Sequence, residues 1–180
     1  MLSVLIEPAL LLSIFGLAAL AGSTEMSSTA DYISREGYLI IGPTLILAAA
    51  SFSITTLAEN ARLPFDNPAT HLELTMVHEA MVLEYSGRSL AFMEYSTWLK
   101  LTVFITILLN GYLPWGISNS LDPLALTVSI IVFMVKLSVA ICLIALLESQ
   151  MAKMRLFRLP NLLTTSFTLA LLALMAYYIL

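Results

Sequence analysis

Long apolar runs alternate with short polar segments along this chain. A helix needs about 20 apolar residues to cross the hydrocarbon core of a bilayer. Five runs reach that length, at residues 2–21, 38–57, 90–113, 124–147 and 161–180. None shows the strict alternation that marks the strands of a membrane barrel. The pattern predicts an all-α protein, a polytopic bundle of about five transmembrane helices in one domain that covers residues 1–180.

The segment between the second and third runs breaks this pattern. Residues 59–88 are expected to form a cytoplasmic loop and helix. At 100° per residue, His71 and His78 share one face of a helix over 69–86, and Glu73 and Glu84 lie on the opposite face. A helix that is polar on two sides is poorly suited to lipid. We therefore predict an amphipathic helix inside the protein or in a water-filled cleft.

The basic residues predict the orientation. The second connection is flanked by two arginines and the fourth contains three basic residues, whereas the first contains one and the third none. Because basic residues accumulate in cytoplasmic loops, the second and fourth connections are expected in the cytoplasm. The first connection, residues 22–37, is then expected to be an acidic loop on the opposite side. Pro43 is expected to bend the second run, since proline lacks a backbone donor.

Composition agrees with a membrane protein and excludes several other classes. The chain is 59% hydrophobic and 11% charged, whereas soluble domains are about 45–50% apolar and about 25% charged. Membrane lipid is therefore one expected partner. The single cysteine, Cys142, excludes an intrachain disulfide. The chain has no basic face for nucleic acid, no nucleophile motif and no phosphate-binding loop.

Ionisable residues gather in one part of the chain. Residues 59–95 hold half of the twelve carboxylates and both histidines. Charged groups at membrane depth are costly and usually serve ion or proton traffic. The candidate proton-pathway residues are Glu7, Glu59, Glu73, Glu79, Glu84 and Glu94, and the candidate relay residues are His71, His78, Lys100 and Lys136. The alternative is that these groups pair with one another, or that the lysines reach to an interface.

A metal site on this chain is not expected. His78-Glu79 begins a zinc-protease motif, but Val82 stands where the second histidine would be. His71 and His78 would lie about 10 Å apart along a straight helix, too far to share one ion.

Several segments together resemble one family. Residues 58–66, AENARLPFD, followed by Glu73-Leu74, Glu84-Tyr85 and the AFMEY of residues 91–95, resemble the hallmark loop of the complex I membrane subunit beside the quinone site. The sequence of residues 66–91 is similar to the corresponding segment in membrane-bound nickel–iron hydrogenases of the formate-hydrogenlyase and hydrogenase-4 type. The segments 7–12 and 153–160 are similar to that group too. The chain resembles the C-terminal part of such a subunit, without the first three of about eight helices.

The resemblance implies a membrane subunit that anchors a soluble redox arm and couples electron transfer to proton or sodium translocation. It places the protein, as a multi-pass protein without bond chemistry of its own, in a bacterial or archaeal cytoplasmic (inner) membrane. The nickel–iron centre and iron–sulfur clusters would belong to partner subunits: the hydrogenase large and small subunits and an iron–sulfur subunit, beside antiporter-like membrane subunits. No cofactor is expected on this chain.

The resemblance also assigns residues. Glu7, Glu59, Glu73, Glu84 and Glu94 match acids of the family's proton path, and Arg62, Pro64, Phe65 and Asp66 match the loop that faces the redox arm.

Two alternatives stay open. The first is a quinone-site subunit of a complex I type NADH-quinone oxidoreductase. It is disfavoured because Asn67, Ala69 and His71 stand where complex I carries further acids, and because Glu84 lies three residues farther from Glu73 than in complex I. The second is a purely structural membrane anchor whose acids only form salt bridges. A stand-alone transporter is disfavoured, since the sequence shows no inverted repeat.

Overall fold

All the regular secondary structure in the described part of the chain is α-helical. The computed structural model describes residues 3–36, 42–63, 65, 85–118, 122–150 and 159–179. Its elements are α1 (Ser3–Ala21), α2 (Met26–Glu36), α3 (Gly42–Glu59), α5 (Arg88–Tyr112), α6 (Pro123–Gln150) and α7 (Leu159–Ile179). The all-α prediction is confirmed, and each of the five apolar runs corresponds to one of these helices. The amphipathic helix expected over 69–86 lies almost entirely outside the described residues.

One detail differs from the sequence prediction. The first connection contains α2, where the sequence predicts only an acidic loop. Its apolar positions, Met26, Ala30 and Ile33, recur at helical spacing, and the last two are buried. Pro43 is the second residue of the described helix α3. The bend expected there stays a prediction, because residues 37–41 lie outside the described residues.

Several described helices are long and apolar enough to cross a membrane. They are α5, α6 and α7, and a bent pair of Ile6–Ala21 with Met26–Arg35, at 59°, forms a fourth candidate. The chain is therefore an integral membrane protein. The number of crossings stays a prediction, because α3, with 18 residues, is not among these candidate spans.

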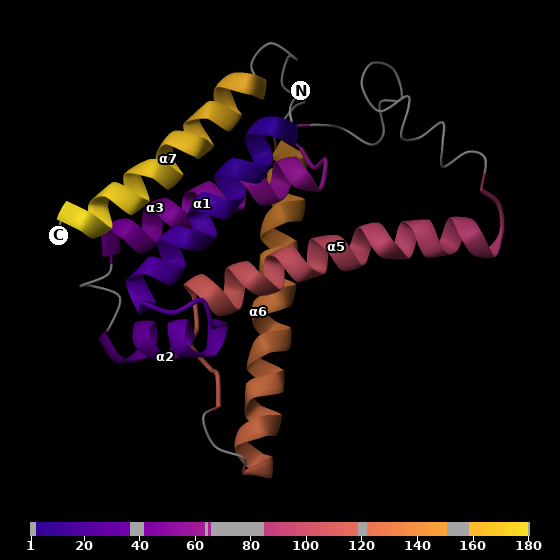
Figure 1. Cartoon of the computed structure of the whole chain (residues 1–180). Helices are drawn as coiled ribbons and strands as arrows, with labels where there is room; N and C mark the ends of the chain where they lie inside the picture. The colour runs from indigo at the N-terminus through magenta and orange to yellow at the C-terminus, as the bar shows by residue number, and fades with distance from the viewer. Residues whose placement is uncertain are drawn as a thin grey trace.

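Helices α1, α3 and α7 pack side by side into a tight three-helix unit (Figure 1). Small side chains form the contacts. The site where a Cβ of Gly16 would stand is 3.8 Å from the Cβ of Ala48 on α3 and 3.9 Å from that of Ala173 on α7. Small residues let helix backbones approach closely, which drives helix association in lipid.

Buried hydroxyl groups fasten the same unit. The Ser51 hydroxyl on α3 donates to the carbonyl oxygen of Ser166 on α7 at 2.8 Å, and the Ser166 hydroxyl donates back to the carbonyl of Ser51 at 3.1 Å. Both residues are fully buried. These two hydroxyls bond to backbone across the helix interface, and therefore contribute to packing.

The C-terminal end of α5 is attached to this unit. The Tyr112 hydroxyl donates to the carbonyl oxygen of Ser13 on α1 at 3.0 Å. Its ring lies 5.6 Å from that of Phe52 on α3. From that point α5 extends away from the bundle, and α6 stands apart as a long single helix (Figure 1).

One buried lysine fastens α6 to the end of α5. Lys136 is the only buried residue within the described helix α6. Its Nζ donates to the carbonyl oxygens of Leu113 at 2.7 Å and Trp115 at 2.9 Å. Gly116 completes the turn with a φ of +83°. A Cβ at this position would stand 2.5 Å from Cγ1 of Val132, so the turn approaches α6 very closely.

Candidate functional site

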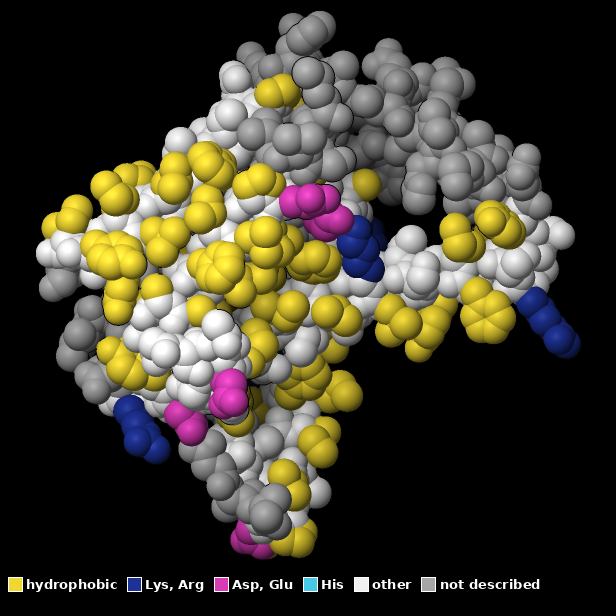
Figure 2. Space-filling model, in the orientation of Figure 1, with side chains coloured by type: hydrophobic (Ala, Val, Ile, Leu, Met, Phe, Trp, Pro, Cys, Tyr) yellow, Lys and Arg dark blue, Asp and Glu magenta, His cyan; other side chains and the backbone are white. Residues whose placement is uncertain are grey.

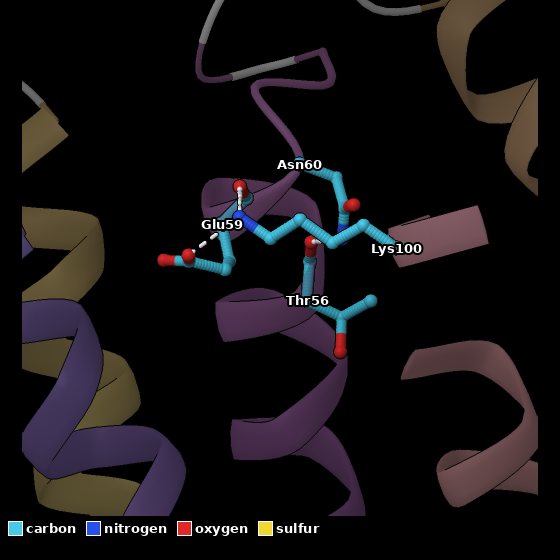
Figure 3. Close-up of polar contacts among 4 residues, drawn as sticks. All are labelled: Thr56, Glu59, Asn60 and Lys100. Atoms are coloured by element: carbon cyan, nitrogen blue, oxygen red, sulfur yellow. Dashed lines mark hydrogen bonds and ion pairs between the residues drawn. The ribbon is translucent and has the colours of Figure 1, made fainter. Parts of the chain in front are cut away.

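The candidate site lies at the C-terminal end of α3, where Glu59 ends the helix. Lys100 reaches it from α5, and its Nζ donates to Oε1 of Glu59 at 2.6 Å and to the Glu59 carbonyl oxygen at 3.1 Å (Figure 3). The carbonyls at a helix C-terminus carry partial negative charge, so an ammonium group is stabilised there. The structure thus brings together one predicted pathway acid and one predicted relay lysine.

Backbone geometry ends α3 at this point. The Arg62 amide donates to the carbonyl of Leu57 at 2.9 Å, and the Ala61 amide donates to that of Ala58 at 3.2 Å. This pair of bonds is the Schellman pattern, which requires a left-handed residue. Ala61 supplies it with a φ of 48°. The side-chain amide of Asn60 donates to the carbonyl of Thr56 at 2.8 Å, which also accepts the Asn60 backbone amide at 3.2 Å (Figure 3).

A second ion pair connects the residues after α3 to α6. Nη1 of Arg62 lies 3.4 Å from Oε1 of Glu148, and the two side chains are 32% and 28% exposed. Glu148 does not stand out in the sequence. It stands at the end of a long apolar run, where polar residues are common, and only the fold reveals its partner.

Phe65 is buried within this chain. The resemblance places it in a loop that faces a redox arm, and the structure packs it against Ile6 of α1 and against Leu159 and Leu163 of α7. With 7% of the residue exposed, Phe65 anchors the start of this loop to the bundle. The contact of the loop with a redox arm stays a prediction, and the predicted contact role stays with Arg62 and the residues beyond it.

The remaining predicted residues do not join this site within the described structure. Glu7 and Glu94 are exposed, and within the described part of the chain neither carboxylate has a hydrogen-bond or ion-pair partner. Lys136 binds the α5–α6 turn, at the opposite end of α5 from Arg88. Seven residues lie outside the described ranges: Pro64, Asp66, His71, Glu73, His78, Glu79 and Glu84.

The arrangement positions charge at the end of α3. Glu59 and Lys100 are partly exposed, at 29% and 45% of their side chains. Beneath the pair, Thr56 is buried and its hydroxyl lacks a hydrogen-bond partner in the described structure. Among the described residues no three acids, cysteines or histidines come close enough together for a metal ion. Such a site can hold charge and fix the position of the loop.

Comparisons with known proteins identify relatives over most of the chain. The model of the NADH dehydrogenase family matches residues 1–179. Formate hydrogenlyase subunit 4 of Escherichia coli is 34% identical over 96% of this chain and 55% of its own length. Hydrogenase-4 component C of the same organism is 29% identical over 96% of this chain and 53% of its own length.

A further relative lies in another complex. An NADH-quinone oxidoreductase subunit of Rubrobacter xylanophilus is 33% identical over 60% of this chain and 33% of its own length. The chain thus spans about half the length of the two hydrogenase relatives and a third of this one. Since the family model covers nearly every residue, this chain belongs to the NADH dehydrogenase family.

Proposed function

We propose that this chain is a membrane subunit of a hydrogenase complex related to complex I. It would anchor the soluble redox arm and couple its electron transfer to the movement of protons or sodium ions. The 34% identity to formate hydrogenlyase subunit 4, across 96% of this chain, carries the proposal. The subunit would cross the cytoplasmic (inner) membrane several times, with the end of α3 on the cytoplasmic side.

The geometry at the end of α3 supports this role. A coupling subunit needs charged groups that respond when the charge of a docked partner changes. Glu59 and Lys100 form a partly exposed ion pair directly before the loop that begins at Arg62. In this proposal a change in the charge of the redox arm shifts the partnering of Glu59, and protons pass through the acids of residues 66–94. Hydrogen oxidation or evolution would take place at a nickel–iron centre of a partner subunit.

Two other functions have specific support. The match to the NADH-quinone oxidoreductase subunit favours a quinone-site role in a complex I type enzyme. The ion pairs Glu59–Lys100 and Arg62–Glu148 favour a structural anchor whose charges only hold the fold. We rank both below the hydrogenase role. The hydrogenase relatives match more of this chain, and both pairs are partly exposed, which makes each a weak contribution to stability.

The first experiment identifies the complex. The chain is tagged in its native host, and its partners are purified in mild detergent and identified by mass spectrometry. We expect a nickel–iron large subunit and hydrogen turnover by the purified complex. Recovery of NADH-oxidising subunits with quinone-dependent turnover would replace the hydrogenase role by the complex I role.

The second experiment tests coupling. The complex is reconstituted into sealed vesicles, and ion movement is measured per hydrogen formed or consumed. Glu84→Gln is expected to lower ion movement because it removes a titratable group from the proposed path. Glu25→Gln is the matched control, since Glu25 is an exposed acid before α2. Equal ion movement in the wild type and in the Glu84→Gln complex would remove Glu84 from the path.

A further inference from the structure

The last residue of α3 and the residues after it are held by three separate contacts. Lys100 of α5 binds Glu59, and Glu148 of α6 binds Arg62. Phe65 is buried against α1 and α7. Within seven residues, 59–65, the chain is thus attached to four helices. The first and third contacts involve elements that are already joined to the three-helix unit, whereas the second involves α6, which is attached much more loosely.

Apart from the Arg62–Glu148 pair, the described contacts of α6 lie near its middle, at the end of α5. Lys136, the only buried residue of the described α6, binds the carbonyls at the end of α5. Glu148 lies twelve residues farther along, about 18 Å away at 1.5 Å per residue. A small rotation of α6 about Lys136 therefore moves Glu148 by a larger distance. Arg62 is bound to Glu148, so it would move with Glu148.

The strength of the Arg62–Glu148 pair suits a positional role. Its separation of 3.4 Å and the partial exposure of both side chains make it a weak pair. A weak pair contributes little to the stability of the fold, but it biases one position of a loop over another. Arg62 lies four residues before Asp66, where the acid-rich segment begins.

We propose that Glu148 is a positioning residue, which holds Arg62 and thereby links the position of α6 to the loop that begins the acidic segment. This inference rests on the proposed coupling function. It assigns a role to α6 that the acids of the loop alone do not provide. Glu148 touches no reacting group in this scheme and acts only through Arg62.

The test uses the complete complex in sealed vesicles, with hydrogen turnover and ion movement recorded together. Glu148→Gln removes the charge and keeps the size of the side chain. The ratio of ions moved to hydrogen turned over is expected to fall about two- to fivefold, the population shift that loss of one partly exposed ion pair produces. Hydrogen turnover with an artificial electron carrier and the subunit composition are expected to stay unchanged. Asp122→Asn is the matched control, because Asp122 is an exposed acid at the other end of α6.

A charge reversal separates a specific contact from a general effect of charge. Glu148→Lys places two cations together and is expected to lower the ratio further than Glu148→Gln. Adding Arg62→Glu to Glu148→Lys restores an attractive pair, and the ratio is expected to recover relative to Glu148→Lys. An unchanged ratio in Glu148→Gln overturns the inference. So does a double variant that retains the soluble subunits and their hydrogen turnover but shows no recovery of the ratio. A wild-type complex that turns over hydrogen without moving ions overturns the proposed function itself, so the two failures are distinguishable.

Discussion

The three-helix unit of α1, α3 and α7 and the pair of α5 and α6 are both apolar, yet they pack in opposite ways. The first buries many small residues, such as Ala9, Ser51 and Ala170. The second exposes large side chains, with Phe92 at 73% and Leu124 at 76%. Figure 2 shows apolar side chains continuing along α5 and α6 beyond the body of the molecule.

The difference shows that hydrophobicity alone does not make helices of this chain associate. Helix α6 is the most apolar of the candidate spans and has the smallest buried share. In lipid there is no hydrophobic gain from bringing two apolar helices together, so association depends on close packing and on hydrogen bonds. Small residues with buried hydroxyls provide both in the three-helix unit, whereas most of α6 presents large apolar side chains outside any contact in the described structure.

The largest expected effect comes from enlarging a small residue inside the three-helix unit. Ser51→Leu forces a bulky side chain into the contact of α3 with α7 and removes the bond that the Ser51 hydroxyl donates to the Ser166 carbonyl. Overpacking costs about 1–3 kcal/mol, and a lost interhelical bond adds about 0.6 kcal/mol. The measurement is thermal unfolding of the purified chain in detergent. Ser138→Leu on the exposed face of α6 is the control and should be close to neutral. Equal destabilisation by both variants would contradict the comparison.

The turn between α5 and α6 is the next test. In Gly116→Ala the new Cβ meets Val132, and the backbone of the alanine must adopt a φ of +83°. A strained position of this kind costs about 2 kcal/mol. Gly22→Ala separates the two causes, because Gly22 also has a positive φ, of 62°, but no atom lies within 4 Å of the point where its Cβ would stand. If Gly116→Ala and Gly22→Ala lower the free energy of unfolding equally, the close approach of the turn to α6 adds nothing to the cost of Gly116→Ala.

Lys136 tests whether α6 depends on one contact. Lys136→Met removes two hydrogen bonds from a charged donor, and each such bond is worth about 1.5–3 kcal/mol. The gain from no longer burying the charge offsets much of this, which leaves a net loss of about 1 kcal/mol. Limited proteolysis of residues 113–122 should become faster in the variant. Unchanged proteolysis together with lost ion movement would return Lys136 to the role of a relay.

The sequence predicts the helices of this fold better than their associations. Apolar runs of bilayer length predict five of the described helices because length alone carries that signal. Helix α2 is missed because its apolar positions are few and its segment is polar overall. The pairing of Ser51 with Ser166 joins residues 115 positions apart, and no local pattern indicates such a contact.

The candidate site divides in the same way. Glu59 and Lys100 stand out in the sequence as charges within or beside apolar runs, and the structure joins them. Phe65 is assigned to a loop from its place in a motif, and the structure adds that this aromatic residue is buried beside an apolar bundle, where burial is favourable. Glu148 is overlooked because one acid at a helix end is ordinary until its partner is known.

The smallest expected effect lies at the junction of the two regions, and it is stabilising. Ala61 ends α3 in the left-handed conformation, which costs an L-residue about 1–2 kcal/mol. Ala61→Gly removes this strain but increases the freedom of the unfolded chain, which costs about 0.4–1 kcal/mol. The net gain is about 0.5 kcal/mol, seen as a small rise in the unfolding temperature of the purified chain.

The same substitution three residues earlier should have the opposite sign. Ala58→Gly lies inside α3, where glycine costs about 1 kcal/mol relative to alanine. The two variants change the same atoms and differ only in backbone conformation. Opposite shifts in the unfolding temperature would show that α3 is terminated by the left-handed Ala61. The chain after Ala61 then leaves the helix axis, which lets Arg62 reach α6 and Phe65 reach the three-helix unit. Two losses of similar size would mean that α3 continues through Ala61 as a regular helix, and the attachment of the loop to both regions would then be wrong.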